Sequence, residues 1–303
     1  MAASLELEFT PPYDWRSIND FLATRAIPGI EVVEDDRYRR TISMNGQHGI
    51  IEVATVNGGR ALVATIRFPD ATAPSAIVQH IRRVFDLDAD VGVIAAHLAV
   101  DPVLRPLVAT RPGLRVPGAW DGFELAVRAM LGQQTTVSGA RRLIGRLVES
   151  HGEPFRATAG DDFDGLSAVF PPPERVAAAD LTLLGMPRAR AAAISRMAAV
   201  AATNPNLFLR NGSLDAAIAR LTALPGVGDW TAHYVAMRAL REPDAFPAAD
   251  VGLLRAMIGP DGLRPTPAAL LARAEAWRPW RAYAAQHLWT ELAAEGTPRG
   301  PRR

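Results

Sequence analysis

The spacing of apolar residues changes once along this chain, close to Leu87, and that change restricts the fold more than any other feature. Before this point, apolar and polar residues alternate in short runs, as they do in half-buried β-strands. After it, apolar residues recur every three or four positions, as they do on the buried face of a helix. The sequence therefore predicts an α+β fold, with an antiparallel sheet and its helices first and a mainly helical part second.

The N-terminal part, residues 1–88, is expected to form one domain. Strands are predicted over 4–9, 40–44, 50–56 and 62–68. The breaks between the last three contain Asn45-Gly46 and Asn57-Gly58-Gly59, which suit tight hairpins and therefore antiparallel pairing. Helices predicted over 14–26 and from residue 75 each have one apolar face, with which they can cover the sheet.

Beyond Leu87, helices are expected over 123–131, 137–148, 174–184, 188–202 and 214–222. The first two are separated by the polar segment Gly132-Gln133-Gln134-Thr135-Thr136. The tail, 296–303, is rich in Gly, Pro and Arg and is expected to be disordered.

Composition excludes several kinds of chemistry. The 303 residues contain no cysteine, which excludes disulfides, thiolate zinc sites, iron–sulfur clusters and a cysteine nucleophile. All 33 basic residues are arginine, so no lysine side chain can form a Schiff base. The net charge of +1 neither requires nor excludes a polyanionic partner.

No apolar run reaches the length of a transmembrane helix, and the first residues lack the layout of a signal peptide. From this we expect a cytoplasmic protein without a membrane partner. The six histidines lie far apart in sequence, without carboxylates at ligand spacing, so no side-chain metal site is predicted.

A short turn, LPGVG at 224–228, separates two predicted helices and produces a helix-hairpin-helix. Gly226 and Gly228 admit backbone angles that other residues avoid, and they expose amide N–H groups beside the positive end of the next helix. Such a turn can bind a phosphate of DNA without basic side chains and without reading its sequence. An ordinary connector in a helical bundle is the alternative.

The segment LPGVGDWTAHYVAMRALREPDAFPAAD at 224–250 resembles the helix-hairpin-helix (HhH-GPD) DNA glycosylases, in which the hairpin, a helix, a short loop and an aspartate follow in this order. AlkA-type enzymes, the DNA-3-methyladenine glycosylases II, are the most similar branch. The resemblance continues in PPYDW at 11–15, RPGLR at 111–115, LGQ at 131–133, LGMP at 184–187, WRPWR at 277–281 and HLW at 287–289.

This resemblance implies two helical domains with the active cleft between them. The central domain would span 122–242 and contain the hairpin. The second would combine 89–121 with 243–295. It further implies a protein that binds double-stranded DNA with a damaged base, near the nucleoid and as a monomer.

Asp250 precedes an apolar helical stripe, so the residues alone favour a helix N-cap. The resemblance places the family's catalytic aspartate on the same residue, and the two roles are compatible. Bifunctional relatives carry a nucleophilic lysine on the helix after the hairpin, and Trp230 occupies that position here. The resemblance therefore implies base excision by water alone, with an uncut DNA backbone.

Trp230 and Tyr234 lie on one helical face, which by itself is more typical of a core. The resemblance places them, with Trp289 and Phe21, in the pocket for the damaged base, whose positive charge would be attracted to aromatic rings. Val251 stands where well-known members carry a further tyrosine. His233 is expected to be a hydrogen-bonded structural histidine rather than a catalytic one.

The remaining expected contacts also come from the resemblance. Gln134 matches the residue that fills the gap left by a flipped nucleotide, and a structural polar residue at a helix break is the alternative. Gly226, Gly228 and Thr231 are expected to contact DNA. A monovalent cation, Na⁺ or K⁺, is expected at the hairpin, with no other cofactor required; its ligands would be the backbone carbonyls of Thr222, Leu224 and Val227.

Three other functions stay open at this point. A non-catalytic helix-hairpin-helix DNA-binding protein would leave Asp250 and the aromatic residues without a purpose. A bifunctional glycosylase for oxidised bases conflicts with the absence of lysine. The resemblance implies alkylated purines, of the 3-methyladenine type, as the substrate, and the same hydrolytic mechanism on deaminated bases, hypoxanthine or uracil, is the alternative.

Overall fold

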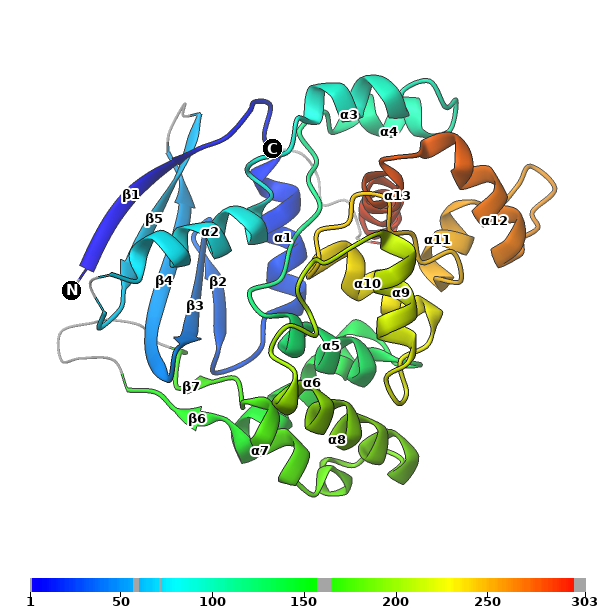
Figure 1. Cartoon of the computed structure of the whole chain (residues 1–303). Helices are drawn as coiled ribbons and strands as arrows, with labels where there is room; N and C mark the ends of the chain where they lie inside the picture. The colour runs from blue at the N-terminus through cyan, green and yellow to red at the C-terminus, as the bar shows by residue number, and fades with distance from the viewer. Residues whose placement is uncertain (1, 57–59, 71, 157–164, 297–303) are drawn as a thin grey trace.

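The computed structural model describes residues 2–56, 60–70, 72–156 and 165–296. It has an N-terminal five-stranded antiparallel sheet, in the order β1-β5-β4-β3-β2, followed by a helical part (Figure 1). The strands are β1 Ala2–Glu8, β2 Glu31–Glu34, β3 Arg37–Met44, β4 Gln47–Thr55 and β5 Ala61–Arg67. The expected α+β fold class is confirmed.

The turn between β3 and β4 explains their register. Asn45 and Gly46 both have positive φ, 52° and 72°, as a type I′ hairpin requires, and Met44 pairs with Gln47 across it. The predicted turn at 57–59 lies outside the described residues. Strand β2 was not predicted, because four residues with a glutamate at each end show no clear alternation.

Two helices pack on the sheet, α1 Trp15–Arg25 and α2 Pro74–Phe85. Ile18 and Leu22 of α1 and Ile77 and Ile81 of α2 enter the same apolar core as the sheet residues. In Figure 1, α2 crosses the sheet, and α1 lies between the sheet and the helical part. The C-terminal end of α1 is thereby placed beside the central helices.

The rest of the described chain is mainly helical, with one short strand pair. Its elements are α3 Val91–Leu98, α4 Leu104–Thr110, α5 Gly122–Gly132, α6 Val137–His151, β6 Glu153–Pro154, β7 Ala168–Val169, α7 Pro173–Ala178, the 3-10 helix η1 Leu181–Leu184, α8 Arg188–Thr203, α9 Leu214–Thr222, α10 Asp229–Arg238, α11 Val251–Ala256, α12 Pro267–Ala274, the 3-10 helix η2 Glu275–Trp277 and α13 Arg281–Gly296. The predicted helix over 174–184 is wrong in one respect, because it is interrupted. Asp180 accepts the amide of Thr182 at 3.1 Å and begins the separate helix η1.

One apolar core runs through the helical part. Helix α4 packs against α13 although α4 ends at Thr110 and α13 begins at Arg281, and α11 also packs against α13 (Figure 1). The predicted disordered tail begins with Gly296, which is the last residue of α13; residues 297–303 lie outside the described ranges. In the part of the chain that the structure describes, every helix is too short or too polar to cross a bilayer.

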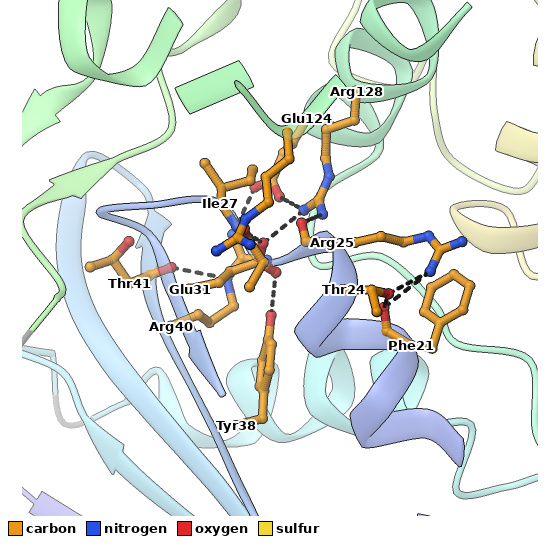
Figure 2. Close-up of polar contacts among 12 residues, drawn as sticks. Phe21, Thr24, Arg25, Ile27, Glu31, Tyr38, Arg40, Thr41, Glu124 and Arg128 are labelled. Carbon is orange, nitrogen blue, oxygen red and sulfur yellow. Dashed lines mark hydrogen bonds and ion pairs between the residues drawn. The ribbon is translucent and has the colours of Figure 1, made fainter. Parts of the chain in front are cut away.

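A buried network of charged side chains joins the sheet to α5 (Figure 2). Arg40 of β3 donates to Glu124 of α5 at 2.7 Å, and Arg128 donates to both Glu124 and Glu31 at 3.0 Å. Burial would raise the pKa of Glu31, but Arg128 and Arg40 outweigh it and hold the pKa below its usual value. Arg128 also donates to the carbonyl of Arg25 at 2.6 Å, which fixes the end of α1.

Candidate active site

Asp250 is the N-cap of α11 and also the centre of a polar cluster. Its Oδ1 accepts the amide of Leu253 at 2.9 Å and the indole N–H of Trp289 at 2.8 Å. Its Oδ2 accepts the indole N–H of Trp230 at 2.8 Å. These donors are neutral, and no ion pair with Asp250 is found in the described ranges. The carboxylate is therefore held in place without a compensating cation.

This carboxylate lines a cavity of about 420 Å³. The four aromatic residues that the sequence suggested for a base pocket, Phe21, Trp230, Tyr234 and Trp289, all line the same cavity. The rings of Trp230 and Tyr234 are stacked, with centroids 5.3 Å apart and planes at 9°, and Tyr234 meets Trp289 edge-on at 6.2 Å. The cavity is thus flat-walled and aromatic beside Asp250.

The far side of the cavity is positively charged. The guanidinium carbon of Arg25 lies 3.8 Å from the centroid of the Phe21 ring, and that of Arg238 lies 4.7 Å from it. Figure 2 shows Arg25 reaching over Phe21. Arg238 donates to the hydroxyl of Tyr234 at 2.7 Å and to the carbonyls of Pro117 and Gly118. Phe21 is therefore covered in part by arginine rather than open on both faces.

These arginines change the acidity of Tyr234. Burial would raise the pKa of this phenol, but the positive charges of Arg238 and Arg25 outweigh burial and lower its pKa. Burial in turn lowers the pKa of Arg25. The hydroxyl of Tyr234 consequently accepts a hydrogen bond from a guanidinium group, that of Arg238. The ring of Tyr234 forms part of the cavity wall.

The hairpin, residues 224–228, joins α9 to α10. Gly226 has φ +76°, and a Cβ there would lie 2.6 Å from Ala193 and 2.9 Å from Met130, so both backbone angle and packing require glycine. Gly228 has an ordinary φ of −86°, so the expected unusual angle at this glycine is wrong. A Cβ on Gly228 would face open space. The absence of a side chain at Gly228 instead leaves room for another molecule to approach the backbone.

The hairpin amides are available to such a molecule. Within the described residues, the N–H groups of Gly226 and Gly228 donate to no backbone acceptor, and both stand at the N-terminal end of α10. Thr231 is 1% exposed, and its hydroxyl accepts a hydrogen bond from Gln133 at 3.0 Å. A contact between DNA and the Thr231 side chain is therefore excluded in this conformation.

The expected cation ligands can be tested by their backbone hydrogen bonds. The carbonyl of Leu224 accepts the N–H of Val227 at 3.1 Å, whereas the carbonyls of Thr222 and Val227 accept no backbone N–H in the described ranges. Carbonyl oxygens keep a second lone pair after one hydrogen bond. Each of the three carbonyl oxygens therefore keeps a lone pair with which it can bind a cation. No group of three or more ionisable side chains suited to a metal is present among the described residues.

Gln134 lies in the loop between α5 and α6. Its φ is +56° and its side chain is exposed. Val251 begins α11 with 63% of its surface exposed and does not line the cavity, so this position adds no wall to the cavity. His233 accepts the amide of Phe246 at its Nδ1, 3.1 Å away, which agrees with a structural role.

Several residues of the site were not predicted from the sequence. They are Arg25, Arg128, Arg141 and Arg238 in the cavity wall, and Gln133 beside the hairpin. A signal existed for two of them, because Arg25 and Arg238 stand four positions after Phe21 and Tyr234 and so share their helical faces. Arg128 has one local partner, Glu124, but its other partners and those of Arg141 and Gln133 lie far away in sequence.

A larger cavity, of about 830 Å³, lies elsewhere and includes Asp86, Arg241 and Tyr283. Its buried carboxylate is fully engaged: Asp86 pairs with Arg241 and accepts the hydroxyl of Tyr283 at 2.8 Å and the amide of Val116 at 3.2 Å. Such a carboxylate is neutralised by its own partners. The cavity at Asp250 is the better candidate for chemistry.

Comparison with known proteins shows the family of this chain. Residues 4–121 match the model of the AlkA N-terminal domain, and residues 127–282 match that of the HhH-GPD superfamily base excision DNA repair proteins. The chain is 39% identical over 95% of its length to the probable bifunctional transcriptional activator/DNA repair enzyme AlkA of Mycobacterium tuberculosis, and it spans 57% of that relative.

Two further similarities cover whole proteins. DNA-3-methyladenine glycosylase 2 of Escherichia coli is 34% identical over 93% of this chain and 95% of its own. The solved structure of 3-methyladenine DNA-glycosylase from Archaeoglobus fulgidus superposes with a TM-score of 0.81 over 97% of this chain and 99% of that chain, at 21% identity, which shows the shared fold. Sequence, fold and matched domains together show that this chain belongs to the HhH-GPD superfamily of base excision DNA repair proteins, in its AlkA branch.

Proposed function

We propose that this protein is a monofunctional DNA glycosylase that hydrolyses the N-glycosidic bond of alkylated purines, of the 3-methyladenine type, in double-stranded DNA. The observation that carries the proposal is the environment of Asp250, a carboxylate held by three neutral N–H donors at the wall of an aromatic cavity. The names of the relatives from Mycobacterium tuberculosis and Escherichia coli support it.

The reaction follows from that environment. As the bond between base and sugar lengthens, the sugar gains positive, oxocarbenium-like charge. A fixed carboxylate without a counter-ion stabilises this charge most strongly in a site from which bulk water is excluded. Asp250 also has lone pairs left to orient or deprotonate the attacking water.

The cavity walls suit a planar, cationic base. Stacked rings of Trp230 and Tyr234 and the edge-on Trp289 attract such a base more than a neutral one. Arg25 and Arg238 repel a cation from the Phe21 end. An alkylated purine would therefore lie toward the tryptophans, where Asp250 adds to its attraction.

Base removal would leave the DNA strand intact. Trp230, at the position of the nucleophilic lysine in bifunctional relatives, donates to Asp250 and cannot form a Schiff base, and the chain has no lysine. Hydrolysis by water is the reaction that these residues support.

DNA would be held at the hairpin, with a phosphate accepting the N–H groups of Gly226 and Gly228. Gln134 would fill the gap left by the flipped nucleotide. A monovalent cation held by the carbonyls of Thr222, Leu224 and Val227 would add positive charge beside that phosphate. The protein would act as a monomer, in the cytoplasm near the nucleoid.

The test uses duplexes that carry an alkylated purine or hypoxanthine, with released base and strand breaks followed separately. We expect base release without breaks, and a loss of about 10³-fold or more in Asp250→Asn with DNA binding retained. Asp90→Asn is the matched control, since Asp90 also caps a helix, α3, and accepts Val93 at 3.1 Å, outside the aromatic cavity. It should excise at the wild-type rate.

Each proposed part can fail separately. No release from any lesion would leave only DNA binding, and release that survives in Asp250→Asn would remove the carboxylate from the chemistry. Breaks that form without hot alkali would contradict the monofunctional assignment. Faster release of hypoxanthine than of the alkylated purine would move the substrate to deaminated bases.

A further inference from the structure

Gln133 connects two loops that are distant in sequence. Its Nε2 donates to the carbonyl of Gly226, in the hairpin, and to the hydroxyl of Thr231, on α10, both at 3.0 Å. These partners lie 93 and 98 residues away along the chain. Both N–H donors of one side-chain amide thus tie the loop between α5 and α6 to the hairpin.

The next residue, Gln134, is held in an unfavourable backbone conformation. Its φ of +56° lies in the left-handed region, which costs a residue with a Cβ free energy and persists only when its surroundings enforce it. The backbone N–H of Gln133 donates to Met130 at 3.4 Å, and Thr136 caps α6 by accepting Gly139 at 3.1 Å. With the loop fixed on both sides, the Cα–Cβ bond of Gln134 has a defined direction.

The hairpin end of this connection is also rigid. Gly226 packs against Met130 of α5 and Ala193 of α8, too closely for a Cβ, and Thr231 is buried. The carbonyl of Gly226 is held by Gln133, whereas its N–H points to no described backbone acceptor. One glycine therefore contacts Gln133 through its oxygen and offers its nitrogen to a ligand.

We propose that Gln133 is a positioning residue that fixes the spacing between the phosphate bound at the hairpin and the point where Gln134 enters the duplex. This inference rests on the proposed function, because it assumes a flipped nucleotide. Gln133 touches neither the base nor Asp250. It acts by holding the phosphate-binding hairpin and the inserted side chain of Gln134 at a fixed distance from each other.

The proposal separates binding from flipping. Phosphate contacts at the hairpin give affinity without sequence information, and they need only the backbone of 226–228. Stabilising the flipped nucleotide also needs a side chain in the vacated space. Loss of Gln133 should therefore leave DNA affinity nearly unchanged and lower the population of the flipped state.

Gln133→Leu and the nearly isosteric Gln133→Glu test this idea. Neither a leucine side chain nor a carboxylate can donate to Gly226 or Thr231. Both variants should therefore excise about tenfold more slowly in single turnover. A 2-aminopurine next to the lesion should report less flipping in both variants, and anisotropy should report an unchanged Kd for the uncharged Gln133→Leu. Gln79→Leu on α2, an exposed glutamine far from the loop, is the matched control and should behave as wild type.

Two readouts exclude a merely structural role. Gln134→Ala removes the inserted side chain itself, so Gln133→Leu combined with it should excise no more slowly than Gln134→Ala alone. In Gln133→Glu, protonation restores one donor, and its deficit relative to wild type should shrink from pH 8 to pH 5. Independent losses in the double variant, or a pH-independent deficit accompanied by a lower Tm, would overturn the proposal.

The outcome also separates this inference from the proposed function. Excision and flipping at wild-type levels in Gln133→Leu would refute the role of Gln133 and leave the glycosylase intact. Absence of excision in wild type would refute the glycosylase, and the 2-aminopurine signal would still decide whether Gln133 controls flipping.

Discussion

Asp250 and the pair Glu31 and Glu124 show two ways in which this protein fixes carboxylates, Asp250 half-buried at a cavity wall and the two glutamates fully buried. Asp250 accepts two indole N–H groups and one amide, all neutral. Glu31 and Glu124 accept instead from the guanidinium groups of Arg40 and Arg128, and both glutamates are buried. Each carboxylate is well supplied with hydrogen bonds, and the difference lies in the charge of the donors.

That difference determines what each carboxylate can do. A carboxylate paired with arginine is neutralised locally, so its charge contributes to holding the sheet against α5. A carboxylate held by neutral donors keeps its negative charge, which extends into the neighbouring cavity. Counting hydrogen bonds alone would not distinguish the two regions. The carboxylate that we propose for catalysis is the one whose partners fix its position without cancelling its charge.

Removal of a charge from the network should have the largest effect on stability. Glu124→Gln leaves Arg40 and Arg128 buried with one carboxylate between them, and breaking a buried pair in this way costs about 3–5 kcal/mol. Urea unfolding should show this loss, with Glu174→Gln on the exposed side of α7 unchanged. The folded Glu124→Gln should still excise, unlike Asp250→Asn. A loss below about 1 kcal/mol would show that the network does not hold the sheet against α5.

The fold could be predicted from the sequence wherever spacing or turn chemistry was regular. The change at Leu87 separated sheet from helices, and Asn45-Gly46 indicated the hairpin between β3 and β4. Strand β2 was missed because its pairing with β3, Glu31 opposite Arg40, depends on partners rather than on local alternation. The interruption at Asp180 was missed because a helix and a 3-10 helix have similar apolar spacing.

A third way to bury an ionisable group is to keep it neutral, as His287 shows. It is 4% exposed, and burial, with Arg111 nearby, lowers its pKa from 6.5 to about 4. The unfolded chain binds the proton at higher pH than the folded chain does. Stability from this group is therefore complete above pH 6.5, falls as the pH drops toward 4, and changes no further below that.

The expected size is about 3 kcal/mol, from 1.36 kcal/mol per pKa unit. Unfolding free energies of wild type and His287→Gln, measured between pH 7 and pH 4, should differ by an amount that shrinks by about this much on acidification. Carboxylates also titrate in this range, and the subtraction removes their contribution. Parallel curves for the two proteins would show that His287 is not held neutral by burial.

The neutral donors around Asp250 can be removed one at a time. Trp289→Phe keeps an aromatic ring but deletes the N–H bound to Oδ1, and Trp230→Phe does the same at Oδ2. Hydrogen bonds to charged groups contribute about 1.5–3 kcal/mol, so we expect at least about a tenfold slower single-turnover excision in each. Trp280→Phe, outside the cavity, is the control. Wild-type rates in both cavity variants would mean that Asp250 is positioned by α11 alone.

The candidate site was predictable in its parts and not in its assembly. Spacing placed Trp230 and Tyr234 on one face, and Asp250 before a helix, but the indole bonds to Asp250 come from residues 20 and 39 positions away. Contacts between residues this far apart produce no periodic pattern in the sequence. The same holds for Gln133, whose importance appears only when the loop after α5 is seen beside the hairpin.

The smallest expected effect concerns His233, which supports the loop that leads to Asp250. Its Nδ1 accepts the N–H of Phe246 at 3.1 Å and its Nε2 lies 3.6 Å from Asp229. Burial lowers the pKa of His233, although Asp229 opposes the shift, so the ring is neutral at pH 7 and can accept. Protonation of Nδ1 in more acidic solution would direct its N–H at the backbone N–H of Phe246, which lies four residues before Asp250.

His233→Asn replaces the ring nitrogen with an amide oxygen that accepts and does not titrate. We expect excision within about threefold of wild type at pH 8, since one neutral hydrogen bond contributes about 1 kcal/mol or less. On acidification below pH 6.5, the wild-type rate should fall more steeply than that of the variant. His233→Leu, which lacks an acceptor at every pH, should be slower throughout. If all three proteins share one pH profile, the loop is held by its other contacts, and the position of Asp250 depends on neutral donors within its own cluster alone.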